Sequence, residues 1–513
     1  MSVTYTAQCF VRPSLSTLRS PYEHLTPAES DRAFSLADVL AIRSIHPFYS
    51  PHVLYPPNAD AIRKARRRAA RGAGEMDLKR QPLLWKKDLY TAIERLINDP
   101  SPRNTFRRSI YTSTTGGGSG SKPLFFATDV HENRRQRALF GRFLRHIGLA
   151  TEKDWIVTVH SAGNLYRSLD LTLELLENAG ATVLAAGHDM PPAAVVRLVT
   201  QYSANVLSGD SGQIVSMVRY ISTLPPDERA RFSINKIIYT SESLTAAQRA
   251  HIRAVLGPET QICSILGSAE GGPYAASSTH LSREHHRRRH HHHHQEDDVS
   301  SAGDFQDFIV DDRMTRIEIL PTRVPENDAS PVSACVPDGE RGMIAQTSLT
   351  RLRNPLVRYI TGDIGSLHRL PPQAAAALPA RERHHMYVLR LYGRDRRFSF
   401  EWGGEYYEFR RLVPLMNDAR LGILQWQVVL DKAEGSEEAW LEVRVLRAGG
   451  DGDGDGDGDG IVSEEELARR IGTFFSLCAA NEERFRLVFL DCLDDFELST
   501  GGRKVVKFID RFN

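Results

Sequence analysis

The sequence predicts an α/β protein, with a large N-terminal domain of mostly parallel, helix-covered sheets and a small, mobile α+β domain at the C-terminus. Between residues 154 and 267, short β-rich runs alternate with helical patterns, which is typical of parallel strands joined by helices. After Gly393 the rhythm changes to a smaller mixture of strands and one helix. We therefore expect two domains, residues 1–393 and 394–513.

In the first domain, we expect strands at 154–160, 181–186, 204–209, 234–240 and 261–267. The helical patterns between them lie at 165–176, after Pro191 and Pro192, at 211–223 and at 245–257. In the second domain, we expect strands at 426–431, 439–446 and 484–491 and a helix at 464–475. Ligands of parallel sheets bind at the carboxyl ends of strands, so the loops there are the first candidates for a site.

The composition argues against several classes of binding partner. Lys and Arg number 65 against 64 Asp and Glu, a net charge of +1 that provides no long-range attraction for nucleic acid or an anionic membrane. The 5 cysteines are widely spaced without CxxC pairs, and no apolar run of about 18 residues or leader pattern is visible. We expect a cytoplasmic protein with no membrane span and no nucleic-acid partner. The basic cluster at 63–71 is best interpreted as a solvated helix face.

Two segments have low complexity: an insertion at 282–298 that contains a histidine run, and a Gly-Asp repeat at 449–460. The end of the repeat fits the spacing of an EF-hand calcium loop, with Asp455, Asp457, Asp459 and Glu466 as ligands. However, the preceding residues have the pattern of a strand, so no entering helix is expected. A solvated, self-repelling connector is the alternative interpretation.

A loop rich in Gly, Ser and Thr follows Tyr111, and it ends at Lys122. Its backbone N–H groups and hydroxyls could converge on phosphate oxygens, because glycine allows close approach, and Lys122 would add positive charge. Pro123 excludes a Walker loop, and a linker remains the alternative. The candidate residues are Ser113, Thr114, Thr115, Gly116, Gly117, Gly118, Ser119, Gly120, Ser121 and Lys122.

Four further segments carry charged residues next to glycines. Glu270 follows the strand at 261–267 and could hold Mg²⁺ against phosphate. Asp363 lies between a predicted strand and a glycine, where it could accept two hydrogen bonds from a ribose. Arg394 stands at the domain boundary, and Lys504 follows two glycines near the C-terminus.

In order and spacing, these segments resemble the adenylate-forming ligases, specifically those of the phenylacetate-CoA ligase type. IHPFYSP and PLLWKKDL resemble segments that precede the family's phosphate loop, and TSESLTAAQR resembles its adenine-side segment. GSAEGGP resembles its strand-end glutamate motif, and the stretch ending in RYITGDIG resembles its ribose-binding motif. The resemblance covers most of the chain.

The resemblance implies ATP, Mg²⁺ and CoA as cofactors and a small carboxylic acid as substrate, of aryl type or of medium size. It implies that residues 113–122 clasp the β- and γ-phosphates, that Glu270 binds Mg²⁺, that Asp363 holds the ribose and that Arg394 lies near the ribose and the hinge. It assigns catalysis to Lys504, Glu270 and Lys122. Further ATP contacts are implied for Glu242, Gly267, Ser268 and Ala269.

The sequence departs from the family pattern at several positions. Leu266 stands where an aromatic residue is usual and Ala269 where a hydroxyl residue is usual, and the acidic pair after Gly-Arg is replaced by Arg396 and Arg397. Two alternatives to the CoA ligase therefore stay open: an adenylating ligase that acylates an amine or a carrier protein, and a nucleotide-binding scaffold without turnover. A homodimer is also left open. We expect the acid to bind near residues 160–164 and 241–244.

Overall fold

The structure is a computed structural model. It describes residues 33–72, 77–114, 125–163, 165–241, 243–278, 305–322, 324, 334–394, 399–402, 405–432, 439–448, 461–478, 481–498 and 504–511.

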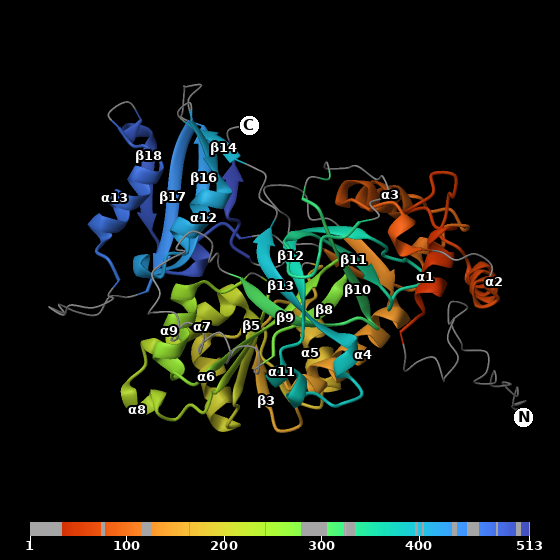
Figure 1. The fold of residues 1–513 in the computed structure, drawn as a ribbon. Coiled ribbons are helices and arrows are strands. Elements are labelled where there is room, and N and C mark those ends of the chain that lie inside the picture. Colours follow the sequence, from red (N-terminus) through yellow and green to blue (C-terminus); the bar gives the residue numbers. More distant parts are fainter. Residues whose placement is uncertain are drawn as a thin grey trace, which may run out of the picture.

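One 11-stranded sheet dominates the N-terminal part of the chain (Figure 1). Its parallel half is made of β3 (Trp155–Thr158), β4 (Thr182–Ala185), β5 (Val206–Asp210), β6 (Lys236–Thr240) and β7 (Gln261–Ser268), in the order β4-β3-β5-β6-β7. All five strands predicted between residues 154 and 267 are thus confirmed, as is the α/β class.

The other half of the sheet is antiparallel. It contains β8 (Gly272–Ala276), β9 (Gln306–Asp311), β10 (Thr315–Leu320), β11 (Gly342–Ser348), β12 (Tyr359–Arg369) and β13 (Met386–Arg394), in the order β10-β11-β12-β13-β9-β8 next to β7. The expectation of a mostly parallel sheet is therefore correct only for β3 to β7. Antiparallel neighbours need no helical crossover, so this half lacks the alternating pattern on which the prediction rested.

Helices cover both faces of the parallel half. Side chains alternate along each strand, so Ile156 of β3 packs with α4 (Val130–His146) and α5 (Ser168–Asn178), whereas its neighbour Val157 packs with α6 (Pro192–Gln201), α7 (Ser211–Ser222) and α9 (Ala246–Leu256). The four helices that the sequence predicts in this region are confirmed and correspond to α5, α6, α7 and α9. The short helix α8 (Pro226–Arg229) follows α7.

The first 129 residues contribute helices α1 (Leu36–Arg43), α2 (Ala59–Ala70) and α3 (Lys86–Asn98), turns η3 (Leu78–Arg80) and η4 (Thr105–Arg107), and the hairpin of β1 (Ile110–Thr114) and β2 (Phe125–Asp129). The basic cluster lies on α2, where Arg63, Arg67 and Arg68 are exposed. The interpretation of this cluster as a helix face is therefore confirmed. Short elements α11 (Pro372–Ala377) and η6 (Arg383–His385) connect β12 to β13.

The C-terminal part has a separate four-stranded sheet in the order β18-β17-β16-β19 (Figure 1, blue). Its strands are β16 (Ile423–Lys432), β17 (Ala439–Arg447), β18 (Phe485–Phe489) and β19 (Phe508–Asp510). It is accompanied by α12 (Phe409–Met416), α13 (Glu464–Phe474), the hairpin β14 (Ser399–Trp402) and β15 (Glu405–Glu408), and turns η7 (Ala419–Leu421), η8 (Glu482–Arg484) and η9 (Leu493–Asp495). Trp402, Val443 and Phe475 belong to a core of its own.

The two parts touch through apolar side chains. Leu424, Leu446, Phe496 and Val505 of the C-terminal part belong to the same buried cluster as residues of α7 and α9. The amide of Gln248 on α9 donates a hydrogen bond to the carbonyl of Leu424. Among the described residues, no helix is both long enough and apolar enough to cross a membrane.

Candidate active site

A network of polar side chains lies at the carboxyl ends of β3, β5 and β6. His160, just beyond β3, is fully buried; its Nδ1 lies 2.8 Å from Thr158 Oγ1 and its Nε2 lies 3.1 Å from Thr240 Oγ1. Asp210, at the end of β5, accepts hydrogen bonds on Oδ1 from the hydroxyls of Thr240 (2.8 Å) and Ser241 (2.5 Å). The ends of three neighbouring strands are thereby linked.

The donors in this network follow from its chemistry. Thr240 has one hydroxyl proton and donates it to Asp210, so its oxygen must accept from His160 Nε2–H. His160 Nδ1 then accepts from the Thr158 hydroxyl. Burial lowers the pKa of His160, and the positive charge of Lys504 lowers it further, while Asp210 acts in the opposite direction. A neutral imidazole fits this bonding pattern, because the protonated ring would have no acceptor nitrogen.

Lys504 reaches this network from the C-terminal part of the chain. Its ammonium interacts with Tyr166, whose hydroxyl also bonds to Ser241. Burial raises the pKa of the Tyr166 phenol, and the adjacent Lys504 opposes the shift. Val505, only 5% exposed, inserts into the cluster shared with β5, β6 and α9, and Val505 also pairs with Leu498 across an isolated antiparallel bridge. The buried valine thus fixes the backbone next to Lys504.

Lys507 contacts different residues from Lys504. Its ammonium lies 4.7 Å from the centre of the Trp426 ring and 3.4 Å from the Trp426 carbonyl oxygen, and it also contacts the amide oxygen of Gln425. All these partners lie on β16, within the C-terminal part. The two lysines therefore face different surroundings, and Lys504 is the one beside the large sheet.

Glu270 lies in the tight turn between β7 and β8. Its side chain is buried, and its Oε1 accepts a hydrogen bond from Tyr90 (2.9 Å) and lies 3.5 Å from Lys86 Nζ. The guanidinium of Arg351 donates to the carbonyl of Glu270. Tyr90 and Lys86, which both lie on α3, thus orient the carboxylate through contacts with its Oε1. Oxygen ligands of this kind suit Mg²⁺.

The residues before Glu270 shape the same turn. Ser268 Oγ accepts the backbone N–H of Gly271 at 2.9 Å, and Ala269 lies between Ser268 and Glu270 in the turn. A Cβ on Gly267 would come within 2.9 Å of Pro273 Cα, so the close approach of β7 and β8 requires glycine there. Leu266 is half-buried and packs against the core of the antiparallel half.

Asp363 and Arg394 are direct cross-strand partners on β12 and β13. Both strands contain left-handed glycines at this point, Gly362 (φ 80°) and Gly393 (φ 102°), and the pairing register shifts between Ile364 and Gly365. The Asp363 backbone N–H donates to Thr361 Oγ1 at 3.1 Å. The residues predicted to lie near the ribose are therefore adjacent, although 30 positions separate them in the sequence.

The predicted phosphate loop connects the two strands of the β1–β2 hairpin. Ser113 pairs with Phe126 and Thr114 with Phe125. Residues 115–122, including Lys122, and also Glu242, Arg396 and Arg397, lie outside the described residues. Their roles stay predictions.

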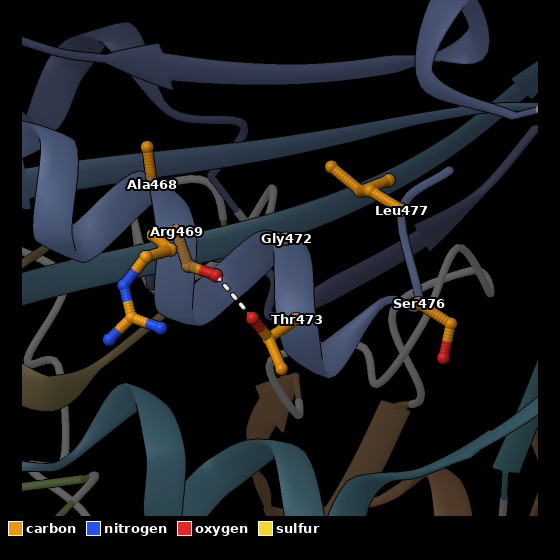
Figure 2. Close-up of a pocket in the computed structure, with 6 residues that line it drawn as sticks. All are labelled: Ala468, Arg469, Gly472, Thr473, Ser476 and Leu477. Atoms are coloured by element: carbon orange, nitrogen blue, oxygen red, sulfur yellow. Dashed lines mark hydrogen bonds between the residues drawn. The ribbon is translucent and has the colours of Figure 1, made fainter. Parts of the chain in front are cut away.

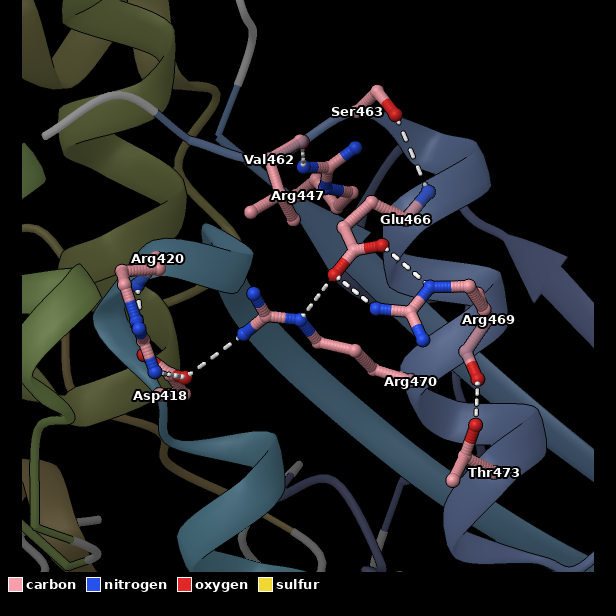
Figure 3. Close-up of polar contacts among 9 residues, drawn as sticks. All are labelled: Asp418, Arg420, Arg447, Val462, Ser463, Glu466, Arg469, Arg470 and Thr473. Atoms are coloured by element: carbon pink, nitrogen blue, oxygen red, sulfur yellow. Dashed lines mark hydrogen bonds and ion pairs between the residues drawn. The ribbon is translucent and has the colours of Figure 1, made fainter. Parts of the chain in front are cut away.

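The calcium prediction is untested at Asp455, Asp457 and Asp459, which lie outside the described residues. Glu466 lies in the first turn of α13, where its carboxylate pairs with Arg469 and Arg470 at 2.7 Å (Figure 3). Those hydrogen bonds lower the pKa of Glu466 to about 2. Both arginines would compete with calcium for this carboxylate. Among the described residues, no group of three or more His, Cys, Asp or Glu could hold a metal.

A surface depression of about 530 Å³ lies beside α13 (Figure 2). Its lining residues belong to α13 and the following turn, and none of them is a predicted site residue. They are Ala468, Arg469, Gly472, Thr473, Ser476 and Leu477.

Sequence reasoning missed Tyr166 and Asp210. The region expected to bind the acid, residues 160–164 and 241–244, does contribute His160 and Ser241 to the network. Asp210 directly follows a predicted strand, which is a signal that could have identified it. Tyr166 becomes recognisable only through its contact with Lys504, far away in the sequence.

The large sheet and its smaller C-terminal partner have the fold of a solved CoA ligase. No family model and no curated protein sequence matches the chain. Among solved structures, the chain is similar to 2-hydroxyisobutyryl-CoA ligase in the postadenylation state with R3-HIB-AMP, with a TM-score of 0.57, 15% identity and coverage of 99% of this chain and 95% of that one. The complex of that ligase with 2-HIB-AMP in the same state also gives 0.57, at 14% identity, covering 96% of this chain and 95% of the other.

An open conformation of the same ligase, in complex with 2-HIB-AMP and CoA, gives a TM-score of 0.50 at 14% identity, covering 96% of this chain and 97% of the other. The predicted fold is therefore confirmed over nearly the whole chain. The phenylacetate-CoA ligase subtype stays a prediction.

Proposed function

We propose that this protein is an ATP-dependent ligase that activates a carboxylic acid as an acyl-adenylate and then transfers the acyl group to CoA. The observation that carries the proposal is the location of Lys504, which reaches from the C-terminal part to Tyr166 at the carboxyl edge of the parallel strands. A lysine ammonium there could neutralise charge on a carboxylate and on the α-phosphate. The adjacent pair Asp363 and Arg394 supports nucleotide binding.

In the first half-reaction, an oxygen of the carboxylate attacks the α-phosphorus of ATP. A new P–O bond forms, the bond to the β-phosphate bridging oxygen breaks, and pyrophosphate leaves with that electron pair. Negative charge grows on the α-phosphate oxygens, and Lys504 and Lys122 are proposed to stabilise it. Asp363 is proposed to orient the ribose, and residues 113–122 the β- and γ-phosphates.

Glu270 fits a role as a magnesium ligand, because it is a buried carboxylate. Its described side-chain contacts, with Tyr90 and Lys86, are both made by Oε1. Mg²⁺ would supply positive charge that neutralises the phosphates. Tyr90 and Lys86 would hold the carboxylate in place. Gly267, Ser268, Ala269 and Glu242 are proposed to lie along the nucleotide.

In the second half-reaction, the thiol of CoA loses its proton to solvent and its sulfur attacks the acyl carbon. A C–S bond forms, the bond between that carbon and the AMP oxygen breaks, and AMP leaves with the electron pair. We place the proposed domain boundary at residues 393 and 394, where β13 ends, so the C-terminal part could reorient between the two steps. An aryl or medium-sized acid remains our proposal for the substrate. An amine or carrier protein remains the alternative acceptor.

The test is acid-dependent exchange of labelled pyrophosphate into ATP, measured over a panel of aryl and aliphatic acids. Exchange that requires an acid supports adenylation, and acyl-CoA formed together with AMP supports CoA as the acceptor. Exchange without acyl-CoA would favour the amine or carrier alternative. Absence of exchange with every acid would contradict the proposal and favour a nucleotide-binding scaffold.

A further inference from the structure

Two guanidinium groups lie over the ring of Tyr111, on β1. The Cζ atom of Arg167 is 4.0 Å from the ring centre, and the Cζ atom of Arg137 is 4.4 Å from it. Both distances are well within the range of a cation–π interaction, which extends to about 6 Å. Arg137 belongs to α4, and its side chain is only 2% exposed. The Tyr111 ring therefore joins β1 both to α4 and to the segment before α5.

A single carboxylate connects the two guanidinium groups. Asp170 Oδ2 lies 2.9 Å from Arg167 Nη2 and 3.1 Å from Arg137 Nη1. The Tyr111 hydroxyl lies 3.3 Å from the same oxygen, and burial raises the pKa of this phenol to about 12, so it keeps its proton and can donate. Glu174, one turn further along α5, pairs with Arg137 at 3.2 Å. Two carboxylates thus balance the two guanidinium charges beside the ring.

Arg167 directly follows Tyr166, the residue that interacts with Lys504. Leu165, immediately before them, has φ 63°, a left-handed conformation that is uncommon outside glycine and persists only where the surrounding structure holds it. This turn presents two neighbouring side chains to two distant segments. Tyr166 contacts Lys504 of the C-terminal part, and Arg167 contacts Tyr111 of the β1–β2 hairpin.

Tyr111 stands near the start of the strand that leads into the predicted phosphate loop. Ser113 is two positions further along β1, so its side chain lies on the same face of the strand as the Tyr111 ring. We infer that Tyr111 and Arg167 are positioning residues, which hold this strand, and the ATP phosphates bound beyond it, in register with Lys504. The inference rests on the proposed function. Register matters because a misplacement of about 1 Å can slow a reaction by about a hundredfold.

Four single variants test the inference. Tyr111→Leu removes the ring, and Arg167→Gln removes one guanidinium from a side chain that is 42% exposed, so the second variant should fold even if the first does not. Tyr111→Phe is the conservative variant, because it keeps the ring beneath both guanidinium groups. Tyr55→Leu is the matched control, since Tyr55 also donates to a carboxylate, Asp99 at 2.7 Å, and its ring centre lies 5.8 Å from Arg103 Cζ.

Calorimetric titration measures ATP binding without any turnover. Tyr111→Leu and Arg167→Gln should each bind ATP about tenfold more weakly than wild type, the size expected for the loss of cation–π contacts at a half-buried ring. Tyr111→Phe and Tyr55→Leu should stay within about twofold of wild type. Acid-dependent pyrophosphate exchange should be about tenfold to hundredfold slower in Tyr111→Leu, because the phosphates and Lys504 lose their alignment.

Combination with Tyr166→Phe separates positioning from general structural support. Tyr166→Phe removes the hydroxyl that interacts with Lys504, on the other side of the same turn. If Tyr111 and Tyr166 act together to align the phosphates and the lysine, their effects on kcat/KM should not multiply. The double variant Tyr111→Leu with Tyr166→Phe should then be about as slow as the slower of the two single variants.

Three results would overturn the inference alone, given a wild type that shows exchange. The first is unchanged ATP binding and exchange in both Tyr111→Leu and Arg167→Gln. The second is an equal loss in Tyr55→Leu, which would mean that any such tyrosine has the same effect. The third is full multiplication of the effects of Tyr111→Leu and Tyr166→Phe, which would make Tyr111 a structural support only. A wild type without acid-dependent exchange would instead overturn the proposed function and the inference with it.

Discussion

The side chain of Lys504 contacts the phenol of Tyr166, so a residue close to the C-terminus interacts with one just before α5 of the large sheet. Val505 is buried in the apolar cluster shared by the two parts of the chain, and it holds the backbone beside the lysine. This relationship brings a cation from the C-terminal part of the chain to the polar strand ends.

Tyr166→Phe should weaken the proposed adenylation without abolishing it. The substitution keeps the ring but removes the hydroxyl that bonds to Lys504 and Ser241. Loss of one hydrogen bond to a charged group costs about 1.5–3 kcal/mol, so kcat/KM for acid-dependent exchange should fall by roughly tenfold to hundredfold. Tyr202→Phe, at an exposed tyrosine on the opposite end of the sheet, is the control. An unchanged rate in Tyr166→Phe would mean that the phenol does not orient Lys504.

Asp363→Ala should weaken ATP binding by about tenfold to hundredfold, because the ribose would lose hydrogen bonds to a charged acceptor. Calorimetric titration of ATP measures this directly. Asp338→Ala removes an exposed carboxylate before β11 and should leave the affinity unchanged. Equal ATP affinity in wild type and Asp363→Ala would remove the ribose assignment.

Glu270→Gln should raise the Mg²⁺ concentration needed for half-maximal exchange by about tenfold. This factor corresponds to the lower end of the free-energy cost of losing a hydrogen bond or contact to a charged group. The amide keeps the size of the side chain and can still accept from Tyr90, so the turn between β7 and β8 should persist. Tyr90→Phe separates positioning from metal binding, since it keeps the ring and the Glu270 carboxylate but removes the hydrogen bond to Oε1. The same magnesium dependence in Glu270→Gln and wild type would contradict the metal assignment.

His46 should make the stability depend on pH. Burial lowers the pKa of His46 to about 3, and its Nδ1 accepts the backbone N–H of Phe48 at 3.2 Å, which requires an unprotonated nitrogen. In the unfolded chain the pKa is about 6.5, so the unfolded state binds the proton first as the pH falls. The stabilisation is complete above about pH 6.5 and decreases below it, by about 2 kcal/mol between pH 6.5 and pH 5.

Urea unfolding at pH 7 and pH 5 measures this dependence. The difference in unfolding free energy between the two pH values should be about 2 kcal/mol smaller in His46→Gln than in wild type, whereas His52→Gln, at an exposed histidine, should behave as wild type. An equal pH dependence in all three proteins would contradict the assignment to His46.

The sequence predicted β3 to β7 because each is a short apolar run followed by a helix, a pattern determined by local chain geometry. It did not predict the antiparallel pairing of the other half, where β9 pairs with the distant strand β13 and β10 pairs with β11. Glu270, Asp363 and Lys504 were recognisable because charge and glycine occur together near predicted strands. Asp210 carries a similar signal, because it directly follows a predicted strand, but Tyr166 does not, since its importance arises from a contact with a distant segment.

Lys504 is proposed to stabilise the transition state of adenylation, and its substitution by alanine tests this role. Acid-dependent pyrophosphate exchange should be about a hundredfold to a thousandfold slower in Lys504→Ala than in wild type, the usual effect of removing one contact that stabilises developing charge. Lys507→Ala is the matched control and should retain most of the activity, because Lys507 interacts with Trp426 within the C-terminal part. Wild-type exchange in Lys504→Ala, with or without a collapse in Lys507→Ala, would contradict the account.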